Sequence, residues 1–183
     1  MFSIFRKRHF IADYLEGLTD MHCHILPGID DGSEDDAMSL AMLKQYIDLG
    51  YIGIVATPHI MDGLYQNSSS KISKVLKSFK KTMIENGYSH FRIGAAAEYM
   101  LDQGFDQLLG EKDFLTISGS KILVEMSYFQ QNIYVETQIF DLQQHGFEPI
   151  LVHPERYPYL QRVDDVLMFQ RKGCYLQLNI LAL

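Results

Sequence analysis

The stretch TDMHCHILPGIDDG, residues 19–32, decides how the rest of the sequence is interpreted. It holds two histidines, one cysteine and three aspartates within fourteen residues. If TDMHCH forms an extended strand, side chains two residues apart face the same way, so His22 and His24 lie on one side and Cys23 on the other. The spacing therefore predicts that the two histidines form one wall of a metal site, and that Cys23 serves in packing.

Short apolar stretches alternate with amphipathic stretches along the rest of the chain. Ser33 and Asp36 have the spacing of a capping signature, which predicts a first helix that ends at Gly50. The βαβα order predicts a mostly parallel sheet with helices outside it. Further helices are expected within 68–87, 133–145 and 163–172, and strands at 51–57, 90–99, 121–126, 149–154 and 175–179.

Each expected strand ends with a polar side chain that is able to take part in chemistry. In α/β barrels the site is assembled at this edge of the strands, from residues far apart in the sequence. We therefore expect these side chains to converge, although the intervening helices separate them along the chain. They are His22 and His24, His59, Glu98, Glu125, His153 and Asn179, in chain order.

These residues have simpler interpretations when each is taken alone. His59 could be a structural, hydrogen-bonded histidine, and Asp30 and Asp31 before a glycine fit an ordinary turn. Glu98 and Glu125 lie in the apolar runs GAAAEYM and ILVEMS, where each could form a salt bridge with an arginine or lysine. A shared cation explains the whole set, because a carboxylate buried without a positive partner is costly.

Composition limits the classes of protein that the chain can represent. With 183 residues, 47% of them hydrophobic, it is expected to form one domain. The net charge of −7 argues against broad nucleic-acid binding, and no apolar run is long enough to span a membrane. The start MFSIFRKRHF lacks the regions of a signal peptide, and Cys23 and Cys174 do not form a disulfide framework. A cytoplasmic location is therefore expected.

Five motifs occur in order along the chain: DMHCHILPGIDDG, ATPH, AAAEY, LVEMS and LVHPERY. Together they resemble the PHP (polymerase and histidinol phosphatase) superfamily, and within it the bacterial metal-dependent protein-tyrosine phosphatases of capsule and exopolysaccharide loci, the CpsB/YwqE type. The resemblance begins at about residue 19 and extends over nearly the whole chain. It implies an α/β fold, a distorted seven-stranded β/α barrel, and hydrolysis of phosphotyrosine on the tail of a bacterial tyrosine autokinase.

The resemblance also implies a centre of three divalent metals, with Mn²⁺ expected and Fe or Zn²⁺ as alternatives. Arg156 would hold the substrate phosphate group through its planar guanidinium, and Asp31 and His153 would act beside it in catalysis. Asp30 would be a neighbouring support. The implied metal ligands are His22 and His24 for the first metal, Glu98 as a bridge between two metals, His59 and Glu125 for the second, and Asp31 and His153 for the third.

The implied fold has a further strand with an Asp-x-His motif, beyond the position of NILAL, where this sequence ends. The sequence after His153 holds no further histidine. We therefore expect the chain to be part of a longer protein, and the strand at 175–179 to offer an open edge that favours oligomers. A phosphoesterase acting on a small phosphomonoester such as histidinol phosphate, or a non-catalytic phosphotyrosine-binding module, remain alternative functions.

Overall fold

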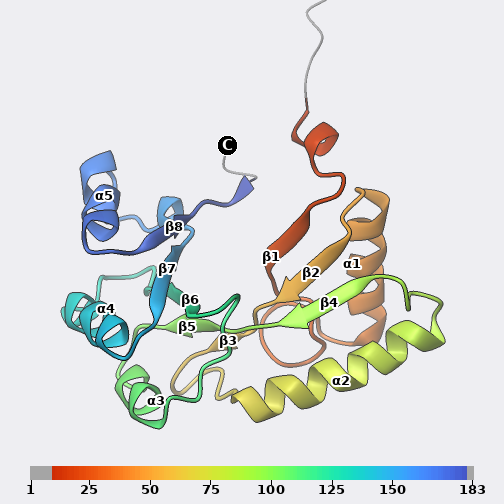
Figure 1. Ribbon diagram of the computed structural model, residues 1–183, viewed down its shortest axis with the longest axis horizontal. Helices are drawn as coiled ribbons and strands as arrows, with labels where there is room; N and C mark the ends of the chain where they lie inside the picture. The colour runs from red at the N-terminus through yellow and green to blue at the C-terminus, as the bar shows by residue number, and fades with distance from the viewer. Residues whose placement is uncertain (1–9, 181–183) are drawn as a thin grey trace, which may run out of the picture.

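The computed structural model describes residues 10–180, in which eight strands alternate with five α helices (Figure 1). Most of the stretch MFSIFRKRHF and the last three residues of NILAL lie outside the described residues. The strands are β1 (Thr19–Cys23), β2 (Gly53–Ala56), β3 (His59–Ile60), β4 (Arg92–Ala95), β5 (Glu98–Met100), β6 (Lys121–Glu125), β7 (Glu148–Val152) and β8 (Tyr175–Gln177). The helices are α1 (Asp36–Asp48), α2 (Ser69–Glu85), α3 (Phe105–Glu111), α4 (Val135–Gln144) and α5 (Val163–Arg171), with 3-10 turns at Ile11–Tyr14 and Pro154–Arg156.

All paired strands are parallel, which confirms the prediction of a parallel α/β fold. They form a sheet of order β1-β2-β4 and a second sheet of order β3-β5-β6-β7-β8. The helices lie around the outside of the strands, whose ends meet near the centre of the molecule (Figure 1). Within the described chain the outer strands are β1 and β4 in the first sheet and β3 and β8 in the second, and closure of a barrel stays a prediction.

The two sheets are joined by strands that bend. Residues 90–99 were expected to form one strand, and 51–57 to run on towards His59, but each extended segment is interrupted and changes sheet. The pairing continues through the bend, because the Ala96 N–H donates to the Ala56 carbonyl and the Glu98 N–H to the Pro58 carbonyl. Pro58 has no N–H for a ladder, which accounts for the interruption before His59. The bend carries His59 and Glu98 as the first residues of β3 and β5.

The expected helices are present, but two features of the helices and the end of the last strand differ from expectation. The N-cap of α1 is Asp35, whose carboxylate accepts a hydrogen bond from the Met38 N–H; Ser33 instead donates its hydroxyl group to the Asp35 carbonyl. The capping role expected of Ser33 was wrong, because SEDD offers several capping side chains in succession. Helix α3 was not expected, and the last strand ends at Gln177 before Asn179.

The hydrophobic core lies between the strands and the outer helices. Ile72, Phe79 and Met83 of α2, which recur at helical spacing, are buried, and Cys23 packs in the same core. Both cysteines are buried and unpaired, and burial raises the pKa of each thiol, that of Cys174 to about 12. Neither cysteine therefore has the low-pKa thiolate of a nucleophile. In residues 10–180, none of the helices has the length and apolar character needed to cross a bilayer.

Candidate metal centre

The two histidines of the opening motif, His22 in β1 and His24 directly after it, face the same side, as their spacing predicted. Their Nε2 atoms are 3.4 Å apart, and the Cys23 sulfur points to the other side of the strand, towards the Val55 carbonyl. The chain then folds back at Gly32, where an added Cβ would overlap the His24 carbonyl oxygen. A glycine is required here because the loop must pass directly over the histidine backbone.

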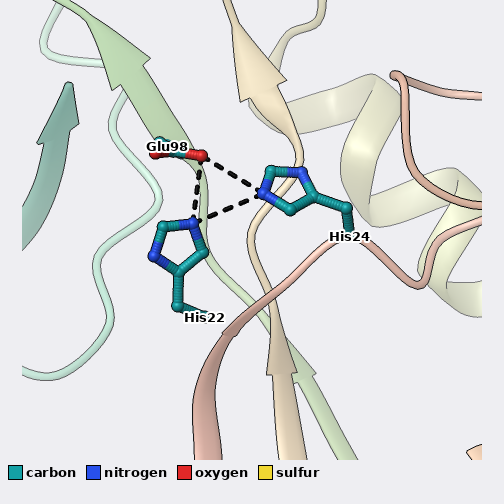
Figure 2. A group of neighbouring side chains, drawn as sticks. All are labelled: His22, His24 and Glu98. Carbon is teal, nitrogen blue, oxygen red and sulfur yellow. Dashed lines mark hydrogen bonds and ion pairs between the residues drawn. The ribbon is translucent and has the colours of Figure 1, made fainter. Parts of the chain in front are cut away.

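Glu98 is the point at which the histidines converge. Its carboxylate is fully buried, and Oε2 lies 3.0 Å from His22 Nε2 and 3.2 Å from His24 Nε2 (Figure 2). The same oxygen is 3.3 Å from His59 Nδ1, and Oε1 is 2.8 Å from His153 Nε2. One carboxylate from β5 thus contacts imidazoles that come from three other parts of the chain.

Glu125, at the end of β6, forms a second contact with His59. The Glu125 Oε1 and His59 Nδ1 atoms are 2.6 Å apart, although the geometry is not that of a hydrogen bond. Within residues 10–180 the ion-pair partners of Glu98 and Glu125 are histidines, not the lysine or arginine of the alternative interpretation. We call the side chains His22, His24, His59, Glu98, Glu125 and His153 the histidine–carboxylate centre.

The two aspartates of the loop 24–33 have different positions. Asp30 Oδ2 is 2.7 Å from His24 Nδ1 and also accepts the His59 N–H, while Oδ1 accepts the Gly32 N–H. Asp30 therefore fixes the orientation of His24 and leaves its Nε2 facing Glu98. Asp31 is more exposed, and its Oδ1 lies 3.4 Å from His59 Nε2.

The ligand atoms fall into three groups in which every atom lies within 4.8 Å of the others. Asp31 is grouped with His24 and His59, whereas the resemblance paired it with His153. His153 lies instead on the far oxygen of Glu98, and its backbone is in the left-handed region at φ 34°. Such strain in a non-glycine residue is characteristic of functional sites. The groups are His22, His24 and Glu98; His24, Asp31 and His59; and His59, Glu98 and Glu125.

A cavity of about 320 Å³, here called the site cavity, opens over the centre. It is lined by Arg156 and by the implied metal ligands other than Glu125, together with Tyr128. Arg156 ends the short 3-10 turn that follows His153, so the two side chains reach the cavity from one turn of chain. The arginine is thus placed to bind an anion above the histidine–carboxylate centre.

The electrostatics of the centre reflect buried carboxylates surrounded by imidazoles. Burial raises the pKa of Glu98, but contacts with His153, His22 and His24 outweigh burial and hold it well below its ordinary value. Burial lowers the pKa of His24, while hydrogen bonds with Asp30 and Glu98 raise it to about 10. Burial raises the pKa of Glu125 above its ordinary value, because His59 compensates only in part.

The centre has the features of a site for divalent cations. Buried polar atoms normally have hydrogen-bond partners, yet His59 Nδ1, Glu125 Oε1 and His153 Nδ1 have none among the described residues. Their donor types, imidazole nitrogen and carboxylate oxygen, are those that Mn²⁺, Fe and Zn²⁺ accept. These residues therefore fit the group of metals that the sequence motifs imply.

Sequence reasoning missed two residues of the site. Gln177 Oε1 accepts the Nδ1–H of His22 at 2.8 Å, which directs the other ring nitrogen towards Glu98. Tyr128 lines the site cavity three residues after Glu125. Asn179 was expected at the end of the last strand, and it borders a neighbouring cavity of about 330 Å³ between β1 and β8.

The fold and the centre define a parallel α/β protein with a cluster of histidines and carboxylates, able to bind metal ions, at its strand ends. The family model for capsular polysaccharide synthesis proteins, CpsB/CapC, matches residues 18–183, and the chain belongs to this family. The chain is 31% identical over 140 residues to the tyrosine-protein phosphatase YwqE of Bacillus subtilis, covering 76% of this chain and 55% of the relative. It is 27% identical over 167 residues to the tyrosine-protein phosphatase CpsB of Streptococcus agalactiae, covering 88% of this chain and 67% of the relative.

The fold has a close counterpart among solved structures. A structure from the pair described for YwqE of Bacillus subtilis and CpsB of Streptococcus pneumoniae, "unique metal-dependent tyrosine phosphatases", superposes with a TM-score of 0.79 at 29% sequence identity. The superposition covers 88% of this chain and 66% of the solved one. The chain thus spans 55% of the length of the Bacillus subtilis relative and about two thirds of the matched structure.

Proposed function

We propose that this chain carries the metal centre of a protein-tyrosine phosphatase that hydrolyses phosphotyrosine on a bacterial tyrosine autokinase and so regulates capsule or exopolysaccharide synthesis. The observation that carries the proposal is the buried Glu98 carboxylate, on which four imidazoles converge beneath Arg156. Membership of the CpsB/CapC family and the tyrosine-phosphatase names of the relatives support it. The autokinase tail is what the resemblance of the five sequence motifs implies.

Different residues of the site would bind the cations and the phosphate group. Glu98, His22 and His59 would hold divalent cations, which supply Lewis acidity and neutralise the charge of a phosphate group. Arg156 binds phosphate oxygens through paired N–H donors, and this orients the ester bond over the centre. His24 is held in orientation by Asp30, and His22 by Gln177, so the protein contributes a centre that is arranged before the substrate arrives.

We propose Mn²⁺ as the metal, with Fe and Zn²⁺ as alternatives, and the assignment of individual ligands follows the groups described above. His22 and His24 would serve one cation with Glu98, and His59 would serve another with Glu98 and Glu125. Asp31 would complete a third group. His153 would act on the side of the phosphate, because it lies between Glu98 and the turn that carries Arg156.

The test compares turnover by the 183-residue chain and by a version extended through the expected Asp-x-His strand, after metal removal with a chelator and reloading with Mn²⁺, Fe²⁺ or Zn²⁺ in parallel. The proposal expects little activity from the 183 residues alone. From the extended version it expects release of phosphate from a phosphotyrosine peptide and little from histidinol phosphate. Preference for histidinol phosphate would replace it with a small-molecule phosphoesterase. Binding of the phosphotyrosine peptide without turnover under all metals would replace it with a binding module.

A further inference from the structure

Tyr128 occupies a position in the site that the metal chemistry does not explain. It lies in the loop after β6 and lines the site cavity together with Arg156 and His153. Its side chain remains 41% exposed, although the neighbouring Glu125 and Tyr157 are buried. A large aromatic ring therefore presents open surface at the entrance to a polar centre.

The ring is fixed from behind by two further tyrosines. Tyr157 stacks on Tyr128 with centroids 5.7 Å apart and planes at 29°, and Tyr159 stacks on Tyr157 at 5.7 Å and 16°. The backbone beside Tyr128 is held by the same pair: the Met126 N–H donates to the Tyr157 hydroxyl group, and the Tyr159 hydroxyl group donates to the Ser127 carbonyl. One face of Tyr128 is thus covered and the ring is held in place before a ligand binds.

The uncovered part of the ring lies next to the proposed phosphate site. The Tyr128 ring is 5.9 Å from the His153 ring, and Tyr128 and Arg156 line the same cavity. A phosphate group bound by Arg156 therefore places the group that it esterifies within reach of Tyr128. Aromatic rings favour offset or edge contacts at centroid distances of about 4.5 to 7 Å, the spacing already found in the tyrosine stack.

We propose that Tyr128 is a specificity-determining residue, whose free face packs against the phenyl ring of an aryl phosphomonoester while Arg156 binds the phosphate group. The inference rests on the proposed phosphatase function and deepens it. A residue that is not a metal ligand would make the site prefer phosphotyrosine to phosphoserine. A serine phosphate has no ring to contact Tyr128. The stack of Tyr128, Tyr157 and Tyr159 would be extended by one ring when the substrate binds.

A purely structural role for Tyr128 makes a different prediction. If the ring served only to support His153, its loss would weaken metal binding and affect all phosphate ligands equally. Tyr65 provides a matched control, since it stacks on the centre residue His59 at 5.6 Å and 15° but lines a different cavity. Tyr65→Leu removes a ring that stacks on the centre without removing one from the site cavity.

The test measures binding of two phosphonates that share a head group, phenylphosphonate and methylphosphonate, to the metal-loaded full chain by calorimetry. Neither ligand is hydrolysed, so differences in leaving group do not enter. The parent chain is expected to prefer phenylphosphonate. Tyr128→Leu should lower that affinity about 2- to 10-fold, the range of an aromatic pair, and leave methylphosphonate affinity unchanged. Tyr128→Phe and Tyr65→Leu should keep the parent ratio of affinities.

The outcomes separate this inference from the proposed function. Equal affinity of the parent for both phosphonates, an unchanged ratio in Tyr128→Leu, or a parallel loss of both ligands in that variant overturns the role of Tyr128. Each of these leaves the phosphatase proposal intact. A metal-loaded chain that binds neither phosphonate overturns both. The ratio of kcat/KM for phosphotyrosine and phosphoserine peptides should move in the same direction as the ratio of affinities.

Discussion

Replacement of Glu98 by glutamine tests the arrangement of the centre most severely, because every histidine of the histidine–carboxylate centre contacts this carboxylate. Glutamine keeps the size of the side chain and one oxygen, but removes the charge that cations and imidazoles share. Glu98 belongs to two of the three groups of ligand atoms, together with His22 and with Glu125. We therefore expect Glu98→Gln to weaken two cation positions at once.

The magnitude follows from ligand linkage. Loss of outer-sphere partners alone weakens metal binding about 10- to 100-fold, and loss of a bridging ligand should cost at least as much. At Mn²⁺ one hundred times the parent Kd, bound metal stabilises the fold by about 2.7 kcal/mol, which falls to about 0.4 kcal/mol if Kd rises 100-fold. For a domain of this size, Mn²⁺ should therefore raise the Tm by about 5 to 11 °C in the parent and by about 1 to 2 °C in the variant.

The assay is thermal unfolding with and without Mn²⁺, combined with metal analysis of the dialysed chain. Glu148→Gln is a matched control, because Glu148 is a glutamate at the start of β7 that pairs with Lys121 at the surface. The control should keep the parent Mn²⁺ response. The reasoning is refuted if Glu98→Gln binds the same amount of metal as the parent while His22→Ala loses it.

Three further predictions concern other parts of the site. Arg156→Ala should keep its bound metal and lose about 1.5 to 3 kcal/mol of phosphate-binding free energy per hydrogen bond, measured by phosphate inhibition. Loss of metal in this variant would instead mean that Arg156 has a structural role. Gln177→Leu should weaken Mn²⁺ binding about 10- to 100-fold, because His22 then loses the acceptor that fixes its tautomer. An unchanged Mn²⁺ affinity, measured by calorimetry, would contradict this prediction. The His24 pKa is raised from 6.5 to about 10, so its protonation stabilises the metal-free chain below pH 6.5 and this contribution is lost as pH rises through 10. Mn²⁺ affinity should accordingly increase with pH up to about 10, and a pH-independent affinity would contradict the assignment.

The sequence predicted much of the fold because its strongest signals are local. The face of α2 formed by Ile72, Phe79 and Met83 follows from helical spacing, and the common side of His22 and His24 follows from strand spacing. Glu98 and Glu125 were identified because a carboxylate in an apolar run needs a partner. Helix α3 is short and its N-cap residue is Gly104, which has no side chain to cap the helix, so its sequence carries little helical signal.

The remaining features depend on contacts between distant segments. The sheet changes at Pro58 because the chain bends there, and only the neighbouring strand reveals that pairing continues through the bend. Gln177 is separated from His22 by 155 residues, and nothing in its own surroundings indicates the contact. Tyr128 is part of a tyrosine stack that the turn after His153 brings to the cavity. Such positions follow from the assembled fold and not from a local pattern.

The most direct measurement of the central claim is anomalous diffraction at the manganese edge from crystals of the chain grown with Mn²⁺. The claim is that the histidine–carboxylate centre holds divalent cations around the Glu98 carboxylate. It predicts anomalous peaks between Glu98 and His22, and between Glu98 and Glu125, that vanish in crystals treated with a chelator. Peaks only at other places on the chain, or none at the centre in a preparation that hydrolyses phosphotyrosine, would contradict it.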